Sequence, residues 1–314
     1  MGFKLSVIVP YHNSEATLER TLLSLSNQQC EPIEIVLVND GSIDHSHDIV
    51  KRFLADNNSG HTFLDISYDY QRGASEAFNI GLKNCTGDFI CKCDSDDTVD
   101  ADYYSALICV AHKENAAIVS SPMTVHSGRK TSVIKPFRGN NLNSMSINTA
   151  NFSLCNRIIS RELLIANSIE AYPHIDRWDD LGIVARVLAL KPKTAYIQKP
   201  GYHYYLTPGM KSLSRSGCNK LLRDHLLCAL LVEHWLTERG LNKEYAEFIH
   251  LLKFVSKVKM LRCSPRDVAR WKATFPETNN GIMHLQQLSL THRILFTLIT
   301  KLPTGLSQWA ADKF

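Results

Sequence analysis

The first 110 residues alternate between short apolar runs and stretches with the spacing of amphipathic helices. Strands that alternate with helices of this length form a mostly parallel, doubly wound α/β sheet with right-handed crossovers, flanked by helices. The expected strands are residues 5–10, 33–38, 65–70 and 88–90. One expected helix starts near Ser14, and two others cover residues 46–54 and 75–82. This pattern constrains the fold more than any other feature of the chain.

Polar residues follow each of the four predicted strands. They are Tyr11–Asn13, Asn39–Ser42, Gln71–Gly73 and Asp94–Asp97, in chain order. Ligands of doubly wound sheets bind beyond the carboxyl ends of the strands, so we expect these four segments to converge on one crevice. Each segment alone is also consistent with an ordinary turn, because Asp-Gly-Ser and glycine are common turn residues. The four together favour a nucleotide-binding site.

The fourth segment places three carboxylates in four positions, Asp94, Asp96 and Asp97. Like charges this close repel one another unless a cation or strong donors compensate them. If the strand continues through the segment, Asp94 and Asp96 share one face, which suits a hard divalent ion that keeps positions open for substrate phosphates. An acidic turn in solvent is the commoner interpretation of an isolated Asp-x-Asp. The converging strand ends make the metal site the stronger hypothesis.

Several function classes are disfavoured by what the sequence lacks. It has no Gly-x-Gly-x-x-Gly after the first strand and no Gly-x-x-x-x-Gly-Lys-Ser/Thr, which argues against a dinucleotide dehydrogenase and a P-loop nucleotidase. A net charge of +4 without a base-reading motif argues against nucleic-acid binding. Nine cysteines without paired spacing indicate reduced thiols, and residues 5–10 are too short for a signal-peptide core, so we expect a cytoplasmic protein.

The converging segments resemble the motifs of the family-2 glycosyltransferases, whose nucleotide-sugar fold is called GT-A. The matching stretches are Ser6–Asn13, Val38–Asp44, Gly73–Gly81 and Asp94–Asp97, and their order and spacing agree over roughly the first 110 residues. Two positions depart from the family pattern. Asn39 replaces the first of two consecutive acids, and Phe78 replaces an arginine.

The resemblance implies a donor site and a divalent metal, Mn²⁺ or Mg²⁺. It places Asp40 against the uracil or ribose, Asp94 against the ribose and Asp96 on the metal. His203 is considered as a third metal ligand, beside the alternative that it packs among the neighbouring tyrosines. The residues expected to hold the nucleoside-diphosphate sugar are Pro10, Asn13, Asp40, Arg72, Asp94 and Ser95, and the expected metal ligands are Asp96, Asp94 and His203.

A second acidic motif, Asp176–Asp180, precedes an apolar helical pattern over residues 183–190. Acids at a helix start can simply satisfy its exposed amide groups and its dipole. The family resemblance offers a different interpretation, a Glu-Asp motif in which Asp180 is the catalytic base and Asp179 occupies the Glu position. In the same resemblance, the loop that contains Lys211 and Arg215 closes over the diphosphate, beside the alternative that both are ordinary basic residues of the surface.

We predict a GT-A catalytic domain and a helical C-terminal region. Residues 1–110 form the nucleotide-binding half of the catalytic domain, residues 111–217 its acceptor-side half, and residues 218–314 the helical region. Between Lys257 and Lys272 six Lys or Arg residues stand against one acid. The later segment 285–302 is broadly apolar, and it could pack internally, contact a second copy in a homo-oligomer or lie on an anionic membrane surface. The nearby basic residues favour peripheral membrane contact.

The leading hypothesis is an inverting, metal-dependent hexosyltransferase. It would move a sugar from a nucleoside diphosphate, with UDP expected, to a hydroxyl of a glycan or lipid-linked saccharide in bacterial surface polysaccharide synthesis. One alternative is a nucleotidyltransferase that makes sugar nucleotides, but residues 11–16 lack the glycine and the basic residue that its loop carries. The other is a non-catalytic nucleotide-sugar-binding scaffold, with Asn39 and Phe78 as signs of decay.

Overall fold

The computed structural model describes residues 5–139, 141–206, 218–261, 267–303 and 305–308. The chain divides into two compact units. Residues 1–140 and 149–210 form unit 1, and residues 141–148 and 211–314 form unit 2. This division lies close to the boundary expected at residue 217, except that residues 141–148 group with the helical region.

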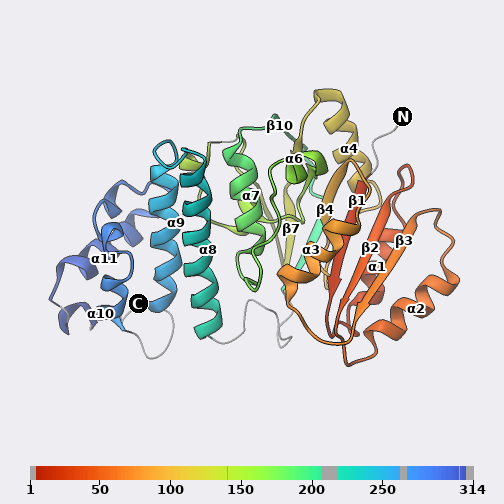
Figure 1. The fold of residues 1–314 in the computed structure, drawn as a ribbon, viewed down its shortest axis with the longest axis horizontal. Helices are drawn as coiled ribbons and strands as arrows, with labels where there is room; N and C mark the ends of the chain where they lie inside the picture. Colours follow the sequence, from red (N-terminus) through yellow and green to blue (C-terminus); the bar gives the residue numbers. More distant parts are fainter. Residues whose placement is uncertain (1–4, 140, 207–217, 262–266, 304, 309–314) are drawn as a thin grey trace. The chain divides into compact units, whose positions relative to one another are not determined.

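Unit 1 is built on a seven-stranded sheet with the order β10-β6-β9-β4-β1-β2-β3 (Figure 1). The strands are β1 (Leu5–Tyr11), β2 (Glu34–Asp40), β3 (Thr62–Tyr68), β4 (Phe89–Lys92), β6 (Ile118–Ser120), β9 (Arg157–Ser160) and β10 (Thr194–Tyr196). Neighbouring strands are parallel except at β9, which runs antiparallel to both β4 and β6. The predicted mostly parallel α/β class is therefore confirmed, and β9 is a strand that the sequence pattern did not predict.

Helices flank this sheet because successive side chains of a strand point to opposite faces. The helices of unit 1 are α1 (Leu18–Ser26), α2 (Ser46–Asp56), α3 (Ala74–Asn84), α4 (Tyr103–Glu114), α5 (Thr149–Phe152), α6 (Arg161–Ala166) and α7 (Asp179–Ala189). Val7 of β1 shares one apolar cluster with Leu22 of α1 and Tyr104 of α4. Its neighbour Ile8 contacts α3 instead, so closely that a Cβ on Gly81 would lie 2.4 Å from the Ile8 Cγ2.

A second, four-stranded sheet adjoins the end of β4. Its order is β5-β11-β7-β8, from β5 (Thr98–Val99), β11 (Tyr202–Leu206), β7 (Met123–Ser127) and β8 (Lys130–Ile134). Strands β7 and β8 pair antiparallel, and β11 runs parallel to β7. Because β5 follows the acidic segment directly, residues 93–97 connect the two sheets.

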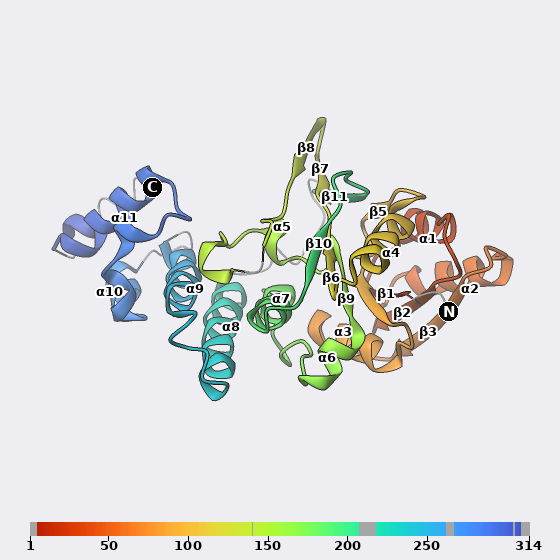
Figure 2. The ribbon, with the colours of Figure 1, turned by 90° about the horizontal axis from the view of Figure 1, so that it is seen from above.

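Unit 2 is helical, as expected. Its main helices are α8 (Cys218–Glu238), α9 (Ala246–Val258), α10 (Val268–Ala273) and α11 (Leu290–Lys301). Within the unit, α9 lies between α8 and α11 in both views (Figures 1 and 2). Phe254, Trp271 and Phe296 bring α9, α10 and α11 together in one buried aromatic cluster. Among the described residues, no helix is both long and apolar enough to cross a bilayer.

Candidate active site

The four polar strand ends lie along one edge of the sheet, because β4, β1, β2 and β3 are adjacent and parallel. Hydrogen bonds connect each pair of neighbouring segments. The Ser14 hydroxyl lies 2.8 Å from the Ser95 hydroxyl, and the Asn13 amide donates to the Ser42 hydroxyl at 3.1 Å. The structure thus brings together the segments that the sequence placed at strand ends.

The acidic segment is a turn that helix α1 holds in place. The Asp97 amide donates to the Asp94 carbonyl at 3.1 Å, and β4 ends earlier, at Lys92. The Thr21 hydroxyl donates to the Asp97 carbonyl at 2.8 Å, and Arg20 donates to the Asp96 carbonyl. The expectation that Asp94 and Asp96 share a strand face is therefore wrong, because the backbone has already left the extended conformation at this point.

Asp97, whose role the sequence left open, is buried and anchors the turn to the second sheet. It accepts hydrogen bonds from the Tyr202 hydroxyl at 2.6 Å and from the Tyr205 amide at 2.9 Å. The Tyr202 hydroxyl also accepts a hydrogen bond from the Asp94 amide. Burial, together with the nearby Asp94 and Asp96 charges, raises the pKa of Asp97. These contacts assign Asp97 to positioning the turn.

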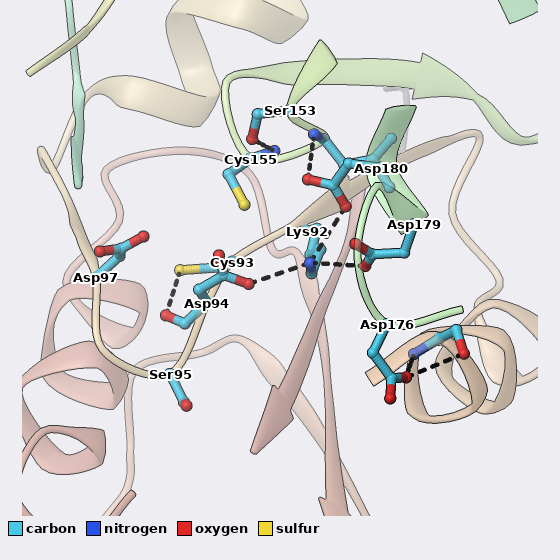
Figure 3. A network of polar contacts seen from close by, with 12 residues as sticks. Lys92, Cys93, Asp94, Ser95, Asp97, Ser153, Cys155, Asp176, Asp179 and Asp180 are labelled. Atoms are coloured by element: carbon cyan, nitrogen blue, oxygen red, sulfur yellow. Dashed lines mark hydrogen bonds and ion pairs between the residues drawn. The ribbon is translucent and has the colours of Figure 1, made fainter. Parts of the chain in front are cut away.

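Lys92 is the residue that connects the two acidic motifs (Figure 3). Its ammonium lies 3.3 Å from Asp94 Oδ1, 3.4 Å from Asp179 Oδ2 and 3.2 Å from Asp180 Oδ1. Burial alone would lower the pKa of Lys92, but attraction to the three carboxylates outweighs it and holds this pKa well above its ordinary value. Lys92 is therefore charged at neutral pH.

Sequence reasoning missed Lys92, although a signal was present. Lys92 ends the strand Phe-Ile-Cys-Lys, in which every residue is buried, and it precedes the acidic segment by one residue. A lysine is rarely buried unless it is paired. A lysine in such a strand therefore indicates a nearby cluster of carboxylates.

Asp179 and Asp180 form the first turn of α7, where the helix dipole favours negative charge. The Asp180 carboxylate is held by two donors, since its Oδ2 accepts from the Leu154 amide at 3.0 Å while its Oδ1 faces Lys92. Burial raises the pKa of Asp179 to about 7, although Lys92 opposes this shift. About a fifth of the Asp180 side chain is exposed, at 19%, which leaves it accessible to a substrate.

Asp176, in the same motif, reaches the strand end after β3. Its Oδ1 accepts from the Ser75 amide and the Ser75 hydroxyl, both at 3.3 Å. A Cβ on Gly73, whose φ is +107°, would lie 2.5 Å from this same oxygen. Gly73 is thus required both by its backbone conformation and by the close approach of Asp176.

The predicted nucleotide-binding residues have different surroundings. The Asp40 carboxylate accepts from the Arg72 and Gly73 amides at 2.7 and 2.9 Å, so this buried side chain shapes the neighbouring loop. The Arg72 guanidinium lies 4.0 Å from the Tyr68 ring centroid. Asn13 accepts from the Ile43 amide. The remaining residues of the set, Pro10, Ser95 and Asp94, lie in β1 and in the acidic turn.

The structure does not place His203 with Asp94 and Asp96 as a set of metal ligands. Both of its ring nitrogens have partners, with Nδ1 3.0 Å from His126 Nε2 and Nε2 2.9 Å from Asp100 Oδ1. No group of three or more His, Cys, Asp and Glu suited to a metal occurs in the described part of the chain. Of the other predicted residues, Lys211 and Arg215 lie outside the described residues.

Asp96 nevertheless has the surroundings of a cation ligand. In the part of the chain that the structure describes, no side chain donates a hydrogen bond to its carboxylate. Burial, with a contribution from the Asp94 charge, raises the pKa of Asp96 to about 6. A partly buried carboxylate without a side-chain donor is stabilised by a bound cation. Asp96 thus suits a hard divalent ion that takes its other ligands from substrate and water.

Comparison with known proteins bears on this arrangement. The model of the family described as "Glycosyl transferase family 2" matches residues 6–166, which include β1 to β4 and the acidic turn. The match ends before Asp176–Asp180. The structure, and not the family match, therefore shows that this second motif lies close to the acidic turn, because Lys92 contacts both.

Two curated relatives and one solved structure illustrate what this chain is similar to. Glycosyltransferase GlyA of Streptococcus pneumoniae serotype 4 is 41% identical over 33% of this chain, and the match spans only 14% of GlyA. The cholesterol galactosyltransferase of Borreliella burgdorferi is 24% identical over 77% of this chain and 70% of that protein. The structure of S. aureus TarS 1–349 in complex with UDP-GlcNAc shares the fold at a TM-score of 0.72 and 19% identity, covering 99% of this chain and 91% of the other. The family model matches half of the chain, so the chain belongs to glycosyl transferase family 2.

Proposed function

We propose that this protein transfers a sugar from a nucleoside diphosphate, with UDP favoured, to a hydroxyl of a saccharide acceptor, with inversion at the anomeric carbon. One observation carries the proposal. Lys92 brings Asp94 of the donor-side turn and Asp180 of α7 within 3.3 and 3.2 Å of a single ammonium group. A donor-binding carboxylate and a candidate base are thereby held at one site.

Asp180 is the base in this proposal. Its two oxygens are oriented by the Lys92 ammonium and the Leu154 amide, so the carboxylate has a defined direction before the acceptor arrives. Asp180 would take the acceptor proton as the hydroxyl oxygen attacks the anomeric carbon, and the bond to the diphosphate breaks on the opposite side. Asp179 also forms an ion pair with the Lys92 ammonium and keeps this ammonium close to Asp180.

Asp96 and Asp94 would hold a divalent ion, Mn²⁺ or Mg²⁺. When bound, such an ion offsets the negative charge that grows on the departing diphosphate. Asp97 has a different part in this site, because its carboxylate is already bonded to Tyr202 and Tyr205. The turn therefore divides its acids between ligand binding and support.

The acceptor is proposed to be a saccharide linked to a lipid, in bacterial surface polysaccharide synthesis. A relative that aligns over most of both chains is named for a lipid acceptor, cholesterol, which supports the lipid part of this acceptor and not its saccharide. The hydroxyl chemistry at Asp180 is the same for a free glycan, so the two acceptor classes have to be compared by experiment.

A panel of UDP- and GDP-linked sugars, each with Mn²⁺ and with lipid-linked or free acceptors, tests the proposal by nucleotide release and product mass. Asp180→Asn should lower the turnover number by about 100-fold or more without weakening nucleotide binding. Asp102→Asn is the matched control, because Asp102 is an exposed acid paired with Lys199. A wild-type protein that binds a sugar nucleotide and transfers nothing would instead support the scaffold hypothesis.

A further inference from the structure

Helix α11 of unit 2 has two apolar faces, and only one of them is covered. Phe296 and Ile299 are buried in the core of the unit. Leu290, Ile294 and Leu298 are 57%, 46% and 49% exposed. These three residues are four positions apart, so they form a continuous row along the helix, here called the α11 stripe. Single exposed leucines are common on protein surfaces, whereas an exposed row along one helix marks a contact surface.

Two further exposed apolar residues flank α11 in the sequence. Met283, before the helix, is 41% exposed, and Leu306, after it, is 56% exposed. A hydrogen bond from Arg293 to the Met283 carbonyl at 2.9 Å ties the preceding segment to the helix. The Lys272 ammonium donates to the Leu302 carbonyl and the Ser307 hydroxyl, which ties the following segment to α10. These contacts attach both flanking segments to helices of unit 2.

The charge around the α11 stripe is one-sided. No Asp or Glu occurs between Glu277 and Asp312, while Arg293 and Lys301 lie within the helix. Residues 141–148 and 211–314 together carry sixteen Lys and Arg against eight Asp and Glu, a net charge of +8. Unit 1 carries nineteen Lys and Arg against twenty-three Asp and Glu, a net charge of −4. Such asymmetry between two parts of a chain indicates an anionic partner for the basic part.

The basis for a membrane contact therefore differs from the one that the sequence suggested. Lys257 and Lys272, at the two ends of the basic segment, donate to carbonyl and side-chain oxygens inside unit 2. They support the helices and do not form a lipid-facing patch. Arg262 and Arg266 lie outside the described residues.

We propose that the α11 stripe lies in the boundary between headgroups and acyl chains of an anionic bilayer. An apolar row in a sequence segment without acids suits this boundary, where leucines enter the acyl region and lysines and arginines meet anionic headgroups. A second copy of the chain is a weaker candidate, because pairing two such surfaces would bring two units of charge +8 together. This proposal concerns binding alone and is independent of the proposed sugar transfer.

Cosedimentation of the full-length protein with vesicles tests the proposal. Wild-type protein should sediment with vesicles of phosphatidylcholine mixed with phosphatidylglycerol, bind phosphatidylcholine alone more weakly, and be released from the anionic vesicles by salt. Replacing Leu290, Ile294 and Leu298 with Gln should lower the partition coefficient about tenfold or more. The control replaces Leu227 and Leu230 of α8, which are 41% and 42% exposed, and should bind like the wild type.

The proposal is overturned if the wild type does not sediment with anionic vesicles, or if both sets of Gln substitutions weaken binding equally. It is also overturned if sedimentation equilibrium shows a dimer that the α11 substitutions dissociate, since the stripe would then bind a second copy. Ile294→Trp gives an independent measurement that needs no loss of binding. Its added fluorescence should shift to the blue on anionic vesicles and be quenched by brominated acyl chains, and an unchanged spectrum would contradict the proposal.

Discussion

Each unit contains a buried lysine, and the two lysines have opposite surroundings. Lys92 of unit 1 is 7% exposed and faces the carboxylates of Asp94, Asp179 and Asp180. Lys257 of unit 2 is fully buried and donates to the Thr274 and Phe275 carbonyls and to Asn279 Oδ1, at 3.0, 3.2 and 2.6 Å.

The two pKa values shift in opposite directions for this reason. At Lys92 the attraction to carboxylates exceeds the effect of burial and raises the pKa. At Lys257 burial dominates, with only a partial contribution from Glu277 in the other direction, and lowers the pKa to about 8. Neutral acceptors are enough to hold a lysine that connects segments of a fold. A buried lysine that forms ion pairs with several carboxylates indicates a candidate binding or catalytic site.

The largest expected effect is that of Lys92→Met. Transfer should fall about 100-fold or more, mainly in the turnover number, because Asp180 loses one of the two donors that orient it and the acids repel one another. Mn²⁺ affinity, measured by calorimetry, should rise at the same time, because a competing cation has been removed. A structural role alone would not produce this rise.

The same substitution also removes a buried counter-charge, which costs about 3–5 kcal/mol of unfolding free energy. The double variant Lys92→Met with Asp179→Asn should recover part of this loss, because it removes one of the repelling charges. Wild-type turnover in a folded Lys92→Met protein would show that Lys92 is not needed for transfer, and the functional contrast between the two lysines would be wrong.

Lys257→Met should leave transfer unchanged and destabilise unit 2. Three acceptors lose their donor, and an unsatisfied buried acceptor costs about 1–3 kcal/mol. Urea unfolding followed by the fluorescence of Trp271, whose ring lies 4.7 Å from the Lys257 ammonium, measures this loss. If transfer fell as strongly as in Lys92→Met, Lys257 would belong to the active site and the contrast would be wrong.

The unfolding free energy of unit 2 should depend on pH because of the lowered Lys257 pKa. Between a folded-state pKa of about 8 and the ordinary value of 10.5, the unfolded chain binds more protons than the folded chain. The unfolding free energy therefore rises with pH through this window, and below pH 8 the cost of charging the buried amine is fully present. Lys257→Met should lack this rise. A wild type and variant with parallel pH profiles would show that the Lys257 pKa is not lowered.

Lys199→Met should have the smallest effect. Lys199 is 64% exposed and pairs with Asp102 at 2.7 Å, and solvent screens such surface pairs. The melting temperature and the rate of transfer should both remain within experimental error of the wild type. A clear loss of either would mean that exposure does not separate structural lysines from functional ones in this protein.

Much of the fold followed from local spacing. The strands at Leu5, Glu34 and Thr62 and the helices between them begin within a few residues of the predicted positions, because apolar periodicity reports which face of an element is buried. Strand β9 was missed because its four residues follow a short helix and carry no alternation. The end of β4 was misjudged for a related reason, since the turn at Asp94–Asp97 depends on bonds from α1 and β11.

The candidate site was predicted in part. Asp94, Asp179 and Asp180 were identified from motifs, and the structure brings them together around Lys92. His203 was predicted as a third metal ligand beside the alternative that it packs among tyrosines. Its ring nitrogens face His126 and Asp100, which come from other segments and could not be recognised as partners from spacing.

The sequence by itself determined the α/β order, the four polar strand ends and the membership of a family with recognisable motifs. Only the tertiary structure decided that Lys92 and Asp180, which are 88 positions apart, form an ion pair. It also decided that α11 leaves one apolar face uncovered. The physical reason is the range of the interactions. Periodicity and turn chemistry act between near neighbours, whereas ion pairing and burial depend on which elements pack together.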